Sequence, residues 1–291
     1  MPLIERATFW KSIVWHQLVI HPLALLLLVA VAAAVAKAEV KTPGTCPGAR
    51  GETVQVRSVT HQLDVVLVDK RTLRIRGLRA PGGTKLWPEL AEMARFGLAG
   101  WIEGQSVQAE IDAGDEDRWG RRMARLWIAP GTKNGRPIAI GPGLIEAGWA
   151  FANPGTISKP CRPEYLRREN IARAGRLGLW HSAYYTPLNA LDVEALNRRT
   201  GEIVLAEGQV LDVRSWKSLV FVNFSKQRGK GLGLMLTSRV QRDFLAEGIK
   251  PDSLKGRTIR VRGLLEPGSG PNPAPRIRLT GPASVEFLNA R

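Results

Sequence analysis

The chain has 291 residues, of which 44% are hydrophobic and 23% charged, which is typical of a globular protein with one large or two ordinary domains and excludes a chain dominated by disorder. Its formal net charge of +16 at pH 7 favours a polyanionic partner, namely nucleic acid, anionic lipid or an acidic wall polymer, without choosing among them. A basic surface that only maintains solubility is the alternative interpretation.

Residues 1–38 predict export. A loosely basic start with Arg6 and Lys11 precedes an apolar run from Leu23 to Ala36, and Ala36-Lys37-Ala38 is similar to a signal-peptidase site. We favour a cleaved signal peptide because the apolar run is short for a membrane span. A retained N-terminal membrane anchor is the alternative. Both interpretations place the remaining chain in the periplasm or cell envelope, tethered to the inner membrane in the second case.

Export changes the meaning of the two cysteines, Cys46 and Cys161. In an oxidising compartment, such a pair is expected to form a disulfide. Two unpaired buried thiols and half of a zinc site are the alternatives.

The first half of the chain alternates short β-like runs with helical patterns. Pro88 suits the first position of a helix, and Gly104 and Gly178 suit helix ends. The predicted elements, in chain order, are strands in 53–77 with a turn at Asp69-Lys70, a helix over 88–104, strands over 106–112 and 121–129, and helices near 144–149 and 163–177. This order predicts a small β-barrel followed by helices.

The periodicity weakens after this unit, so we predict a linker over 183–201 between domains at 51–182 and 202–291. The second unit shows three strand-like runs, a helix near 239–247 and further strands, which is the element order of an OB-fold barrel. The predicted fold class is therefore mainly β with α, with two OB-like barrels in tandem.

One short sequence recurs in the two units. RTLRIRGL at Arg71–Leu78 is echoed by RTIRVRGL at Arg257–Leu264. Strand alternation predicts that Leu73 and Ile75 face a core while Arg74 and Arg76 face the other way, and the same holds for the echo. Eight residues are too few to establish a duplication.

Four blocks carry a resemblance to a known family. They are RIRGLRAPG, DEDRWGRRMARLWI, LIEAGWAFANP and YLRRENIARAGRLGLW, in that order. Over residues of about 51 to 182, the chain resembles the thermonuclease (staphylococcal nuclease-like) family. The part from about 202 onward is similar to the C-terminal extension of some exported bacterial members.

The resemblance implies an OB-fold barrel with three helices and calcium-dependent cleavage of phosphodiester bonds in DNA and RNA. Its two phosphate-binding arginines fall on Arg74, before the Gly-Leu-x-Ala-Pro turn, and on Arg121, in the Asp-x-aromatic-Gly-Arg motif. Both arginines are present.

The family's carboxylates are replaced at the matching positions. The calcium aspartate before Ala-Pro becomes Arg79, the general-base glutamate becomes Gly82, and the Asp-Gly-Asp turn aligned with His61-Gln62-Leu63 places Leu63 at the remaining calcium aspartate. Asp64 is one residue away, and a one-residue offset in a strand reverses the face unless a bulge intervenes. Calcium takes six to eight oxygen ligands, mainly carboxylate, so Arg79 would repel it.

We therefore predict a catalytically degenerate domain that binds nucleic acid or another polyanion through an arginine-rich cleft, without a metal or other cofactor. Arg76 and Arg79 are its additional ligand-binding candidates. In a simpler interpretation, Arg74 and Arg76 are solvated and Arg121 pairs with a nearby carboxylate such as Asp117.

Two other functions stay open. A calcium-dependent endonuclease could recruit Asp64 or Asp117 as its carboxylate. A structural envelope protein could use its basic surface on anionic lipid or a protein partner. His61 and Trp119 are weaker candidates for a base and for a stacking side chain.

The second barrel combines aromatic and basic side chains in the way of single-strand binders. The ligand-binding candidates are Phe224, Lys226, Arg228 and Lys230, with Phe221 beside them. An ordinary exposed glycine-rich turn is the alternative interpretation of this loop.

Overall fold

The computed structural model describes residues 46–81, 88–114, 116–129, 135–227, 229–268 and 274–288. The chain divides into two compact units, and all of the described residues lie in the second, Gly44–Arg291. The predicted signal or anchor segment, residues 1–38, lies outside the described residues. Within the described ranges, every helix is too short or too polar to cross a bilayer.

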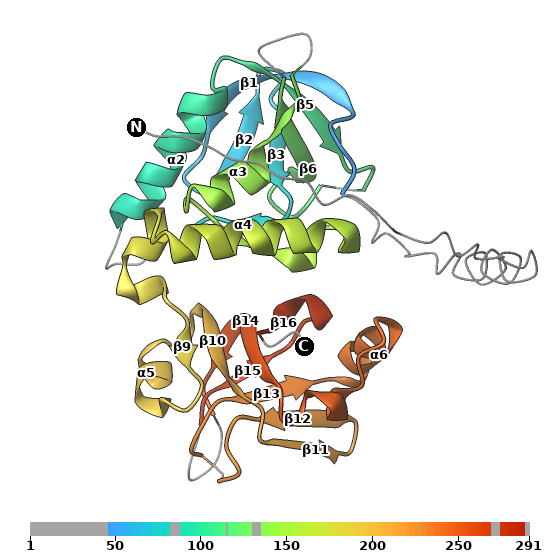
Figure 1. The fold of residues 1–291 in the computed structure, drawn as a ribbon. Helices are drawn as coiled ribbons and strands as arrows, with labels where there is room; N and C mark the ends of the chain where they lie inside the picture. Colours follow the sequence, from blue (N-terminus) through green and yellow to red (C-terminus); the bar gives the residue numbers. More distant parts are fainter. Residues whose placement is uncertain are drawn as a thin grey trace, which may run out of the picture. The chain divides into compact units, whose positions relative to one another are not determined.

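The first barrel has five strands, and a parallel pairing between two of them closes it. Its strands are β1 (Glu52–Val59), β2 (Asp64–Leu67), β3 (Thr72–Ile75), β5 (Ser106–Ile111) and β6 (Arg121–Ile128). They follow the order β3-β2-β1-β5-β6, and β3 pairs with β6 in parallel to complete the circle (Figure 1). Two short additions are β7 (Ile138–Ala139) beside β6, and β4 (Leu78–Arg79) paired with β8 (Phe151–Ala152). This is the OB-like barrel that the sequence predicts.

Strand alternation builds the core of this barrel. On β3, Leu73 and Ile75 are buried as predicted, and the same period on β1 buries Val54 and Val56. The intervening side chains point outward, which is how Arg74 reaches the surface.

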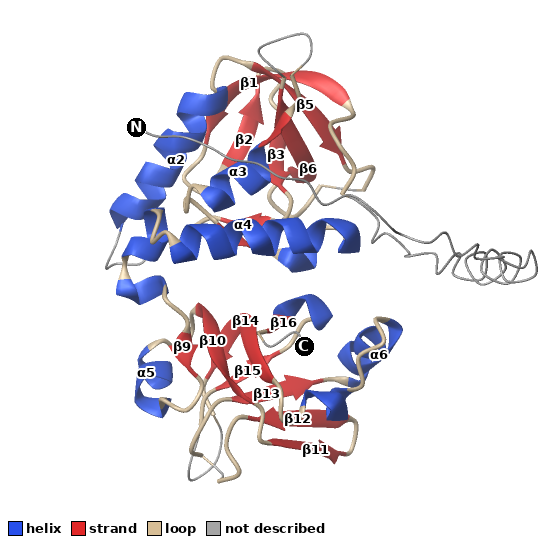
Figure 2. Ribbon diagram, viewed as in Figure 1, coloured by secondary structure: helices blue, strands red, loops and turns tan. Residues whose placement is uncertain are grey.

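Three longer helices lie against the first barrel (Figure 2). They are α2 (Pro88–Ile102), α3 (Ile140–Glu146) and α4 (Arg162–Ala174). The predicted helix at 144–149 thus begins and ends earlier, and Trp149 lies beyond it. Gly77 shows how closely α4 packs, because a Cβ on this residue, at φ 78°, would lie 2.3 Å from Cε1 of Tyr165. Only glycine suits that position in the RIRGL motif.

Cys46 and Cys161 form a disulfide, as predicted. The bond joins the first described residue to the residue before α4, across a sequence separation of 115. It therefore ties the segment preceding β1 to the start of the helix that covers the barrel.

The predicted linker over 183–201 carries regular structure. It contains η4 (Ala183–Tyr185), β9 (Leu188–Asn189) and α5 (Val193–Arg198). β9 pairs in parallel with the first strand of the second barrel. The predicted boundary between two domains stays a prediction. The other short 3-10 helices are η1 (Pro154–Thr156), η2 (Lys159–Cys161), η3 (Gly178–His181), η5 (Pro251–Leu254) and η6 (Pro282–Ser284).

The second barrel repeats the strand order of the first. Its elements are β10 (Ile203–Gln209), β11 (Asp212–Trp216), β12 (Leu219–Asn223), β13 (Gly233–Leu236), α6 (Ser238–Ala246), β14 (Thr258–Glu266), β15 (Arg276–Arg278) and β16 (Val285–Phe287). The order is β11-β12-β13-β15-β14-β10, with β13 and β15 parallel. Because β10 runs on into β11, these two strands act as one long first strand, and β12 and β13 are the second and third.

The eight-residue echo occupies different places in the two barrels. Arg71–Leu78 contains the third strand of the first barrel, whereas Arg257–Leu264 lies on the fourth strand of the second. The shared pattern therefore reflects a strand whose apolar residues face a barrel core, and is no sign of duplication.

Candidate functional site

The two predicted phosphate-binding arginines converge on a single carboxylate. Arg74 Nε and Nη2 donate to the two oxygens of Asp64 at 2.8 and 3.1 Å, and Arg121 Nη1 donates to Asp64 Oδ2 at 3.0 Å. Asp64 is only 4% exposed. The strand pairing explains the convergence, because Asp64 lies opposite Arg74 on β2 and β3, and β3 is the parallel neighbour of β6, which begins at Arg121.

Arg121 is also held from the other side, by the turn that precedes β6. Its Nε and Nη2 donate to Asp117 Oδ2 at 3.0 and 2.7 Å, while Asp117 Oδ1 accepts from the backbone N–H groups of Trp119 and Arg121. The side-chain bond from Arg121, helped by those backbone donors, lowers the pKa of Asp117 to about 2. The same bond raises the pKa of Arg121. We call Arg74, Arg121, Asp64 and Asp117 the arginine cluster.

The placement of Leu63 at a calcium aspartate is wrong. Leu63 is buried in the barrel core, and its φ of 61° is the left-handed conformation that glycine favours. It therefore takes the place of the glycine in the Asp-Gly-Asp turn, so that Gln62 and Asp64 take the places of the two aspartates. Simple strand alternation does not anticipate the left-handed backbone at Leu63, after which regular pairing begins with Asp64 opposite Arg74.

Gln62 belongs to the same site, although the sequence did not predict it as a site residue. Its Oε1 accepts from Arg74 Nη2 at 3.0 Å and lies 3.5 Å from Arg121 Nη1. The only available signal was its position beside Asp64 in a degenerate turn.

Arg79 and Arg76 have different environments. Arg79, on β4, is exposed, and partial desolvation and then the like charge of Arg74 lower its pKa. Among the described residues Arg79 has no carboxylate partner. Arg76 instead forms an ion pair with Asp112 and stands outside the arginine cluster. Gly82, the predicted general-base position, lies outside the described residues.

The described side chains do not fit a calcium site as they stand. Both carboxylates of the arginine cluster already accept from arginine on one or both oxygens, and calcium needs six to eight oxygen ligands. Within the described ranges, no three histidine, cysteine or acidic residues come together as a set of metal ligands.

Trp119 provides an exposed aromatic surface beside the arginine cluster. Its side chain is 60% exposed, and its ring lies 4.5 Å from the guanidinium carbon of Arg121. Trp127, in contrast, is buried on β6. His61 is exposed, and its Nδ1 contacts a carboxylate oxygen of Glu92 on α2.

Phe224 of the second barrel is not a surface residue. It is 1% exposed and packs in the core beneath Gly208, so its predicted role in ligand binding is wrong. Lys226 and Lys230 are exposed, and Arg228 lies outside the described residues.

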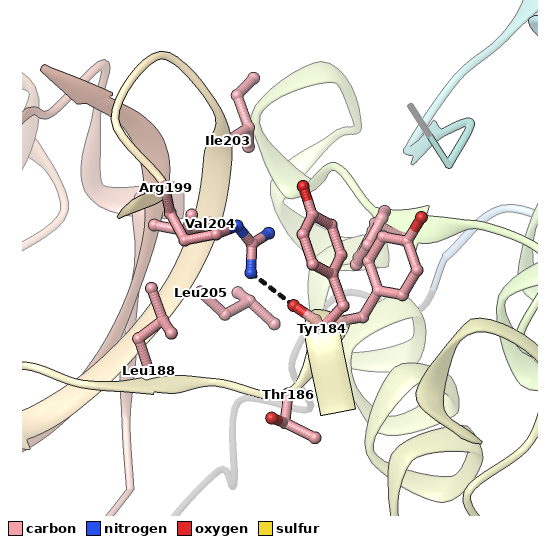
Figure 3. Close-up of a pocket in the computed structure, with 9 residues that line it drawn as sticks. Tyr184, Thr186, Leu188, Arg199, Ile203, Val204 and Leu205 are labelled. Carbon is pink, nitrogen blue, oxygen red and sulfur yellow. Dashed lines mark hydrogen bonds between the residues drawn. The ribbon is translucent and has the colours of Figure 1, made fainter. Parts of the chain in front are cut away.

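Neither of two hollows in the structure contains the predicted site residues. The first, about 10 Å³, is the size of a single water and is bordered by Arg199, which donates to the Tyr184 carbonyl at 2.5 Å and lies over its ring (Figure 3). The second, about 480 Å³, is bordered by the ion pair of Arg162 and Glu247. The arginine cluster lies outside both of these hollows.

Comparison with known proteins agrees with this geometry. Residues 72–182 match the family described as Staphylococcal nuclease homologue, a span that includes β3 to β6 and the helices of the first barrel. The chain is also 30% identical to Protein ParB of Escherichia coli over 156 residues, which are 52% of this chain and 82% of that protein. A domain of this type indicates a nuclease-like or nucleic-acid-binding function. The chain belongs to the staphylococcal nuclease homologue family.

Proposed function

We propose that the first barrel binds the phosphate backbone of nucleic acid at the arginine cluster. In this proposal the barrel is a binding module and does not act as a metal-dependent nuclease. The observation that carries this proposal is the convergence of Arg74 and Arg121 on Asp64. A guanidinium group that is already fixed loses little conformational entropy when it binds a phosphate, and arginine presents a planar fork that suits phosphate oxygens.

The cluster keeps donors and positive charge available for a ligand. Arg74 Nη1 has no hydrogen-bond partner among the described residues, and Arg79 beside it lacks a carboxylate. The cluster and Arg79 together contain three arginines and two aspartates, which leaves an excess of one positive charge. The exposed ring of Trp119 could stack on a base next to a phosphate held there.

The cellular setting belongs to the same proposal. The basic and apolar pattern of residues 1–38 supports export to the periplasm or cell envelope, with the N-terminal segment as a membrane anchor if it is retained. The Cys46–Cys161 disulfide is in keeping with an oxidising compartment.

Calcium-dependent cleavage is the second candidate function, and one observation favours it. Asp64 stands at the second aspartate of the family's turn, between the two arginines. Against it, Arg79 replaces another calcium aspartate, and Asp64 is committed to ion pairs.

Binding tests the first function. We expect Arg74→Ala to weaken binding of the full chain to a labelled single strand and to reduce the salt slope by about 0.7, the value for one phosphate contact on a single strand. The matched control is Arg57→Ala, which removes the same charge from an exposed position on β1. Equal affinities and slopes for the two variants would contradict the proposal.

Cleavage decides between the two functions. Asp64→Asn removes a negative charge from the cluster, so a binding module should keep or increase its affinity, with intact substrate in calcium and in chelator alike. A nuclease should cut in calcium, and the same variant should abolish that cutting. Asp112→Asn is the control, because Asp112 pairs with Arg76 outside the cluster.

A further inference from the structure

The sheet of the second barrel has an inner and an outer row of side chains across four strands. Val213, Val222, Leu234 and Ile277 are paired across β11, β12, β13 and β15 and pack in or against the core. One residue along each strand, the register aligns a second row, which faces outward by strand alternation: Arg214, Phe221, Met235 and Arg278.

This outer row combines apolar surface with positive charge. Met235 is buried yet is not a member of the core cluster, so the side chains beside it on the outer face cover it, and Phe221 directly opposite is half-buried. The side chains of Arg214 and Arg278 at the two ends of the row are 69% and 53% exposed. The row is therefore an apolar centre between two accessible guanidinium groups.

An exposed aromatic side chain extends the row toward the β11–β12 hairpin. Trp216 ends β11 and is 60% exposed, with Lys217 Nζ 4.7 Å from its ring. We call Arg214, Trp216, Phe221, Met235, Arg276 and Arg278 the outer sheet face.

Positive charge exceeds negative charge on and around the outer sheet face. Glu266 is shared by Arg276 and Arg278, at 3.4 Å from each, and Asp212 pairs with Arg214. The loop from β12 to β13 adds two exposed lysines at the edge of the same strands. In the described ranges, six basic side chains thus face two carboxylates: Arg214, Lys217, Lys226, Lys230, Arg276 and Arg278 against Asp212 and Glu266.

We propose that the outer sheet face binds single-stranded nucleic acid, separately from the arginine cluster of the first barrel. β12 and β13 are the second and third strands of the barrel, and this is the face that OB-folds use for oligonucleotides. Aromatic rings on a basic sheet surface accept stacked bases, while arginines at both ends bind the backbone. Binding to a membrane surface would need a larger exposed apolar area. Of the described residues of the outer sheet face, Trp216 alone is a large apolar side chain that is more than one-third exposed.

The test measures binding of the full chain to a fluorescein-labelled single strand of about 12 nucleotides, within the range that one OB-fold covers. The test variant is Arg214→Glu with Arg278→Glu. The matched control is Arg239→Glu with Arg242→Glu, which changes the net charge equally at exposed positions on α6. We expect the test variant alone to lose affinity, and to lower the salt slope by about 1.4 for two phosphate contacts on a single strand.

Stacking has its own readout. Trp216→Ala should weaken binding by about 5- to 150-fold, which corresponds to one base–aromatic stack. A single strand that carries iodouracil should cross-link to Trp216 or Phe221. Both results should persist in an Arg74→Ala background, so that loss of the proposed function in the first barrel leaves this test intact.

Three outcomes would overturn the proposal. They are equal losses in the test and control variants, cross-links that map only to the first barrel, and a test variant that keeps its affinity for the oligonucleotide while it loses binding to phosphatidylglycerol vesicles. Circular dichroism of each variant establishes that the compared proteins are folded.

Discussion

Arg74 and Arg121 are long side chains, and each loses rotamer freedom when it is held in one position. Asp64 and Asp117 hold them with charge-assisted hydrogen bonds of 2.7 to 3.1 Å. The aspartates thus serve as positioning residues for the arginines, and their own charge reduces the local positive potential. The loss of one aspartate should therefore loosen the site and make it more positive.

The pH dependence of this arrangement follows from Asp117. Its pKa in the folded state, about 2, lies below the ordinary value of 3.8 because of the hydrogen bond from Arg121. A lowered folded pKa contributes stability above the unfolded value, and that contribution is lost as the pH falls from about 4 toward 2. Carbon-13 NMR of the Asp117 carboxyl should show a titration midpoint near 2.

Asp117→Asn serves as the control for this prediction. It should reduce the dependence of stability on pH in that window, where other carboxylates with a lowered pKa, such as Asp69, still contribute. Asp69→Asn, which affects a carboxylate at the β2–β3 turn, should not affect the Arg121 resonances. A midpoint for Asp117 near 3.8 would contradict the prediction.

Turns between the strands impose backbone conformations that their residues do not favour. The predicted turn at Asp69-Lys70 joins β2 and β3, and Lys70 there has a φ of 73°. Lys217, in the β11–β12 hairpin, has a φ of 51°. A residue with a Cβ pays about 1–2 kcal/mol for the left-handed conformation, and glycine does not.

We expect Lys70→Gly to stabilise the protein by up to about 1 kcal/mol, because the relief of strain exceeds the extra entropy of an unfolded glycine. Gly104 provides the mirror experiment. Its φ is 72°, and a Cβ there meets no atom within 4 Å, so Gly104→Ala should destabilise through strain alone. Urea unfolding measures both changes, and shifts of the same sign in the two variants would contradict this account.

At the scale of the whole molecule, arginines on β14 connect the second barrel to the helix of the first. Arg262 donates to Glu169 on α4 at 2.8 Å and to the carbonyl of Ala152 at 2.6 Å, and Glu169 is fully buried. Burial lowers the pKa of Arg262, but Glu169 and Glu286 outweigh it and raise that pKa. The echoed arginines thus differ in their contacts: Arg74 on β3 belongs to the arginine cluster, whereas Arg260 and Arg262 on β14 bond to α4 of the first barrel.

This connection predicts cooperative unfolding of the two barrels. Glu169→Gln leaves the buried Arg262 with one carboxylate fewer, and removal of a partner from a buried ion pair costs about 3–5 kcal/mol. The remaining pair with Glu286 should hold the loss near the lower end. We expect calorimetry to show one transition for the unaltered protein, and a lower or divided transition for the variant.

The control for this prediction is an exposed ion pair of the same chemistry. Glu194→Gln breaks the pair with Arg198 on α5, both of whose side chains are mostly exposed, and should cost less than about 0.5 kcal/mol. Equal losses for the two variants would show that the Arg262 connection carries no special stability.

Short-range sequence patterns predicted much of this fold. Alternation at Leu73 and Ile75, proline at the start of α2 and the motif around Arg121 led to the barrel, the helices and the two arginines, because each depends on a few neighbouring residues. The disulfide followed from a count of two cysteines and an expected compartment.

Other features depend on contacts between distant segments. Whether Leu63 or Asp64 faces the arginines depends on the left-handed backbone at Leu63 and on the pairing of Asp64 with Arg74 across β2 and β3. Phe224 continues the alternation of Val220 and Val222 on β12, so the period of two already indicated an inward side chain, and the packing under Gly208 places it in the core. By itself the sequence determined which residues carry charge and which strands and helices form, because these depend on composition and on short-range periodicity. Only the tertiary structure decided which arginines share Asp64 and which join the two barrels, because these ion pairs link residues that lie 57 and 93 positions apart in the chain.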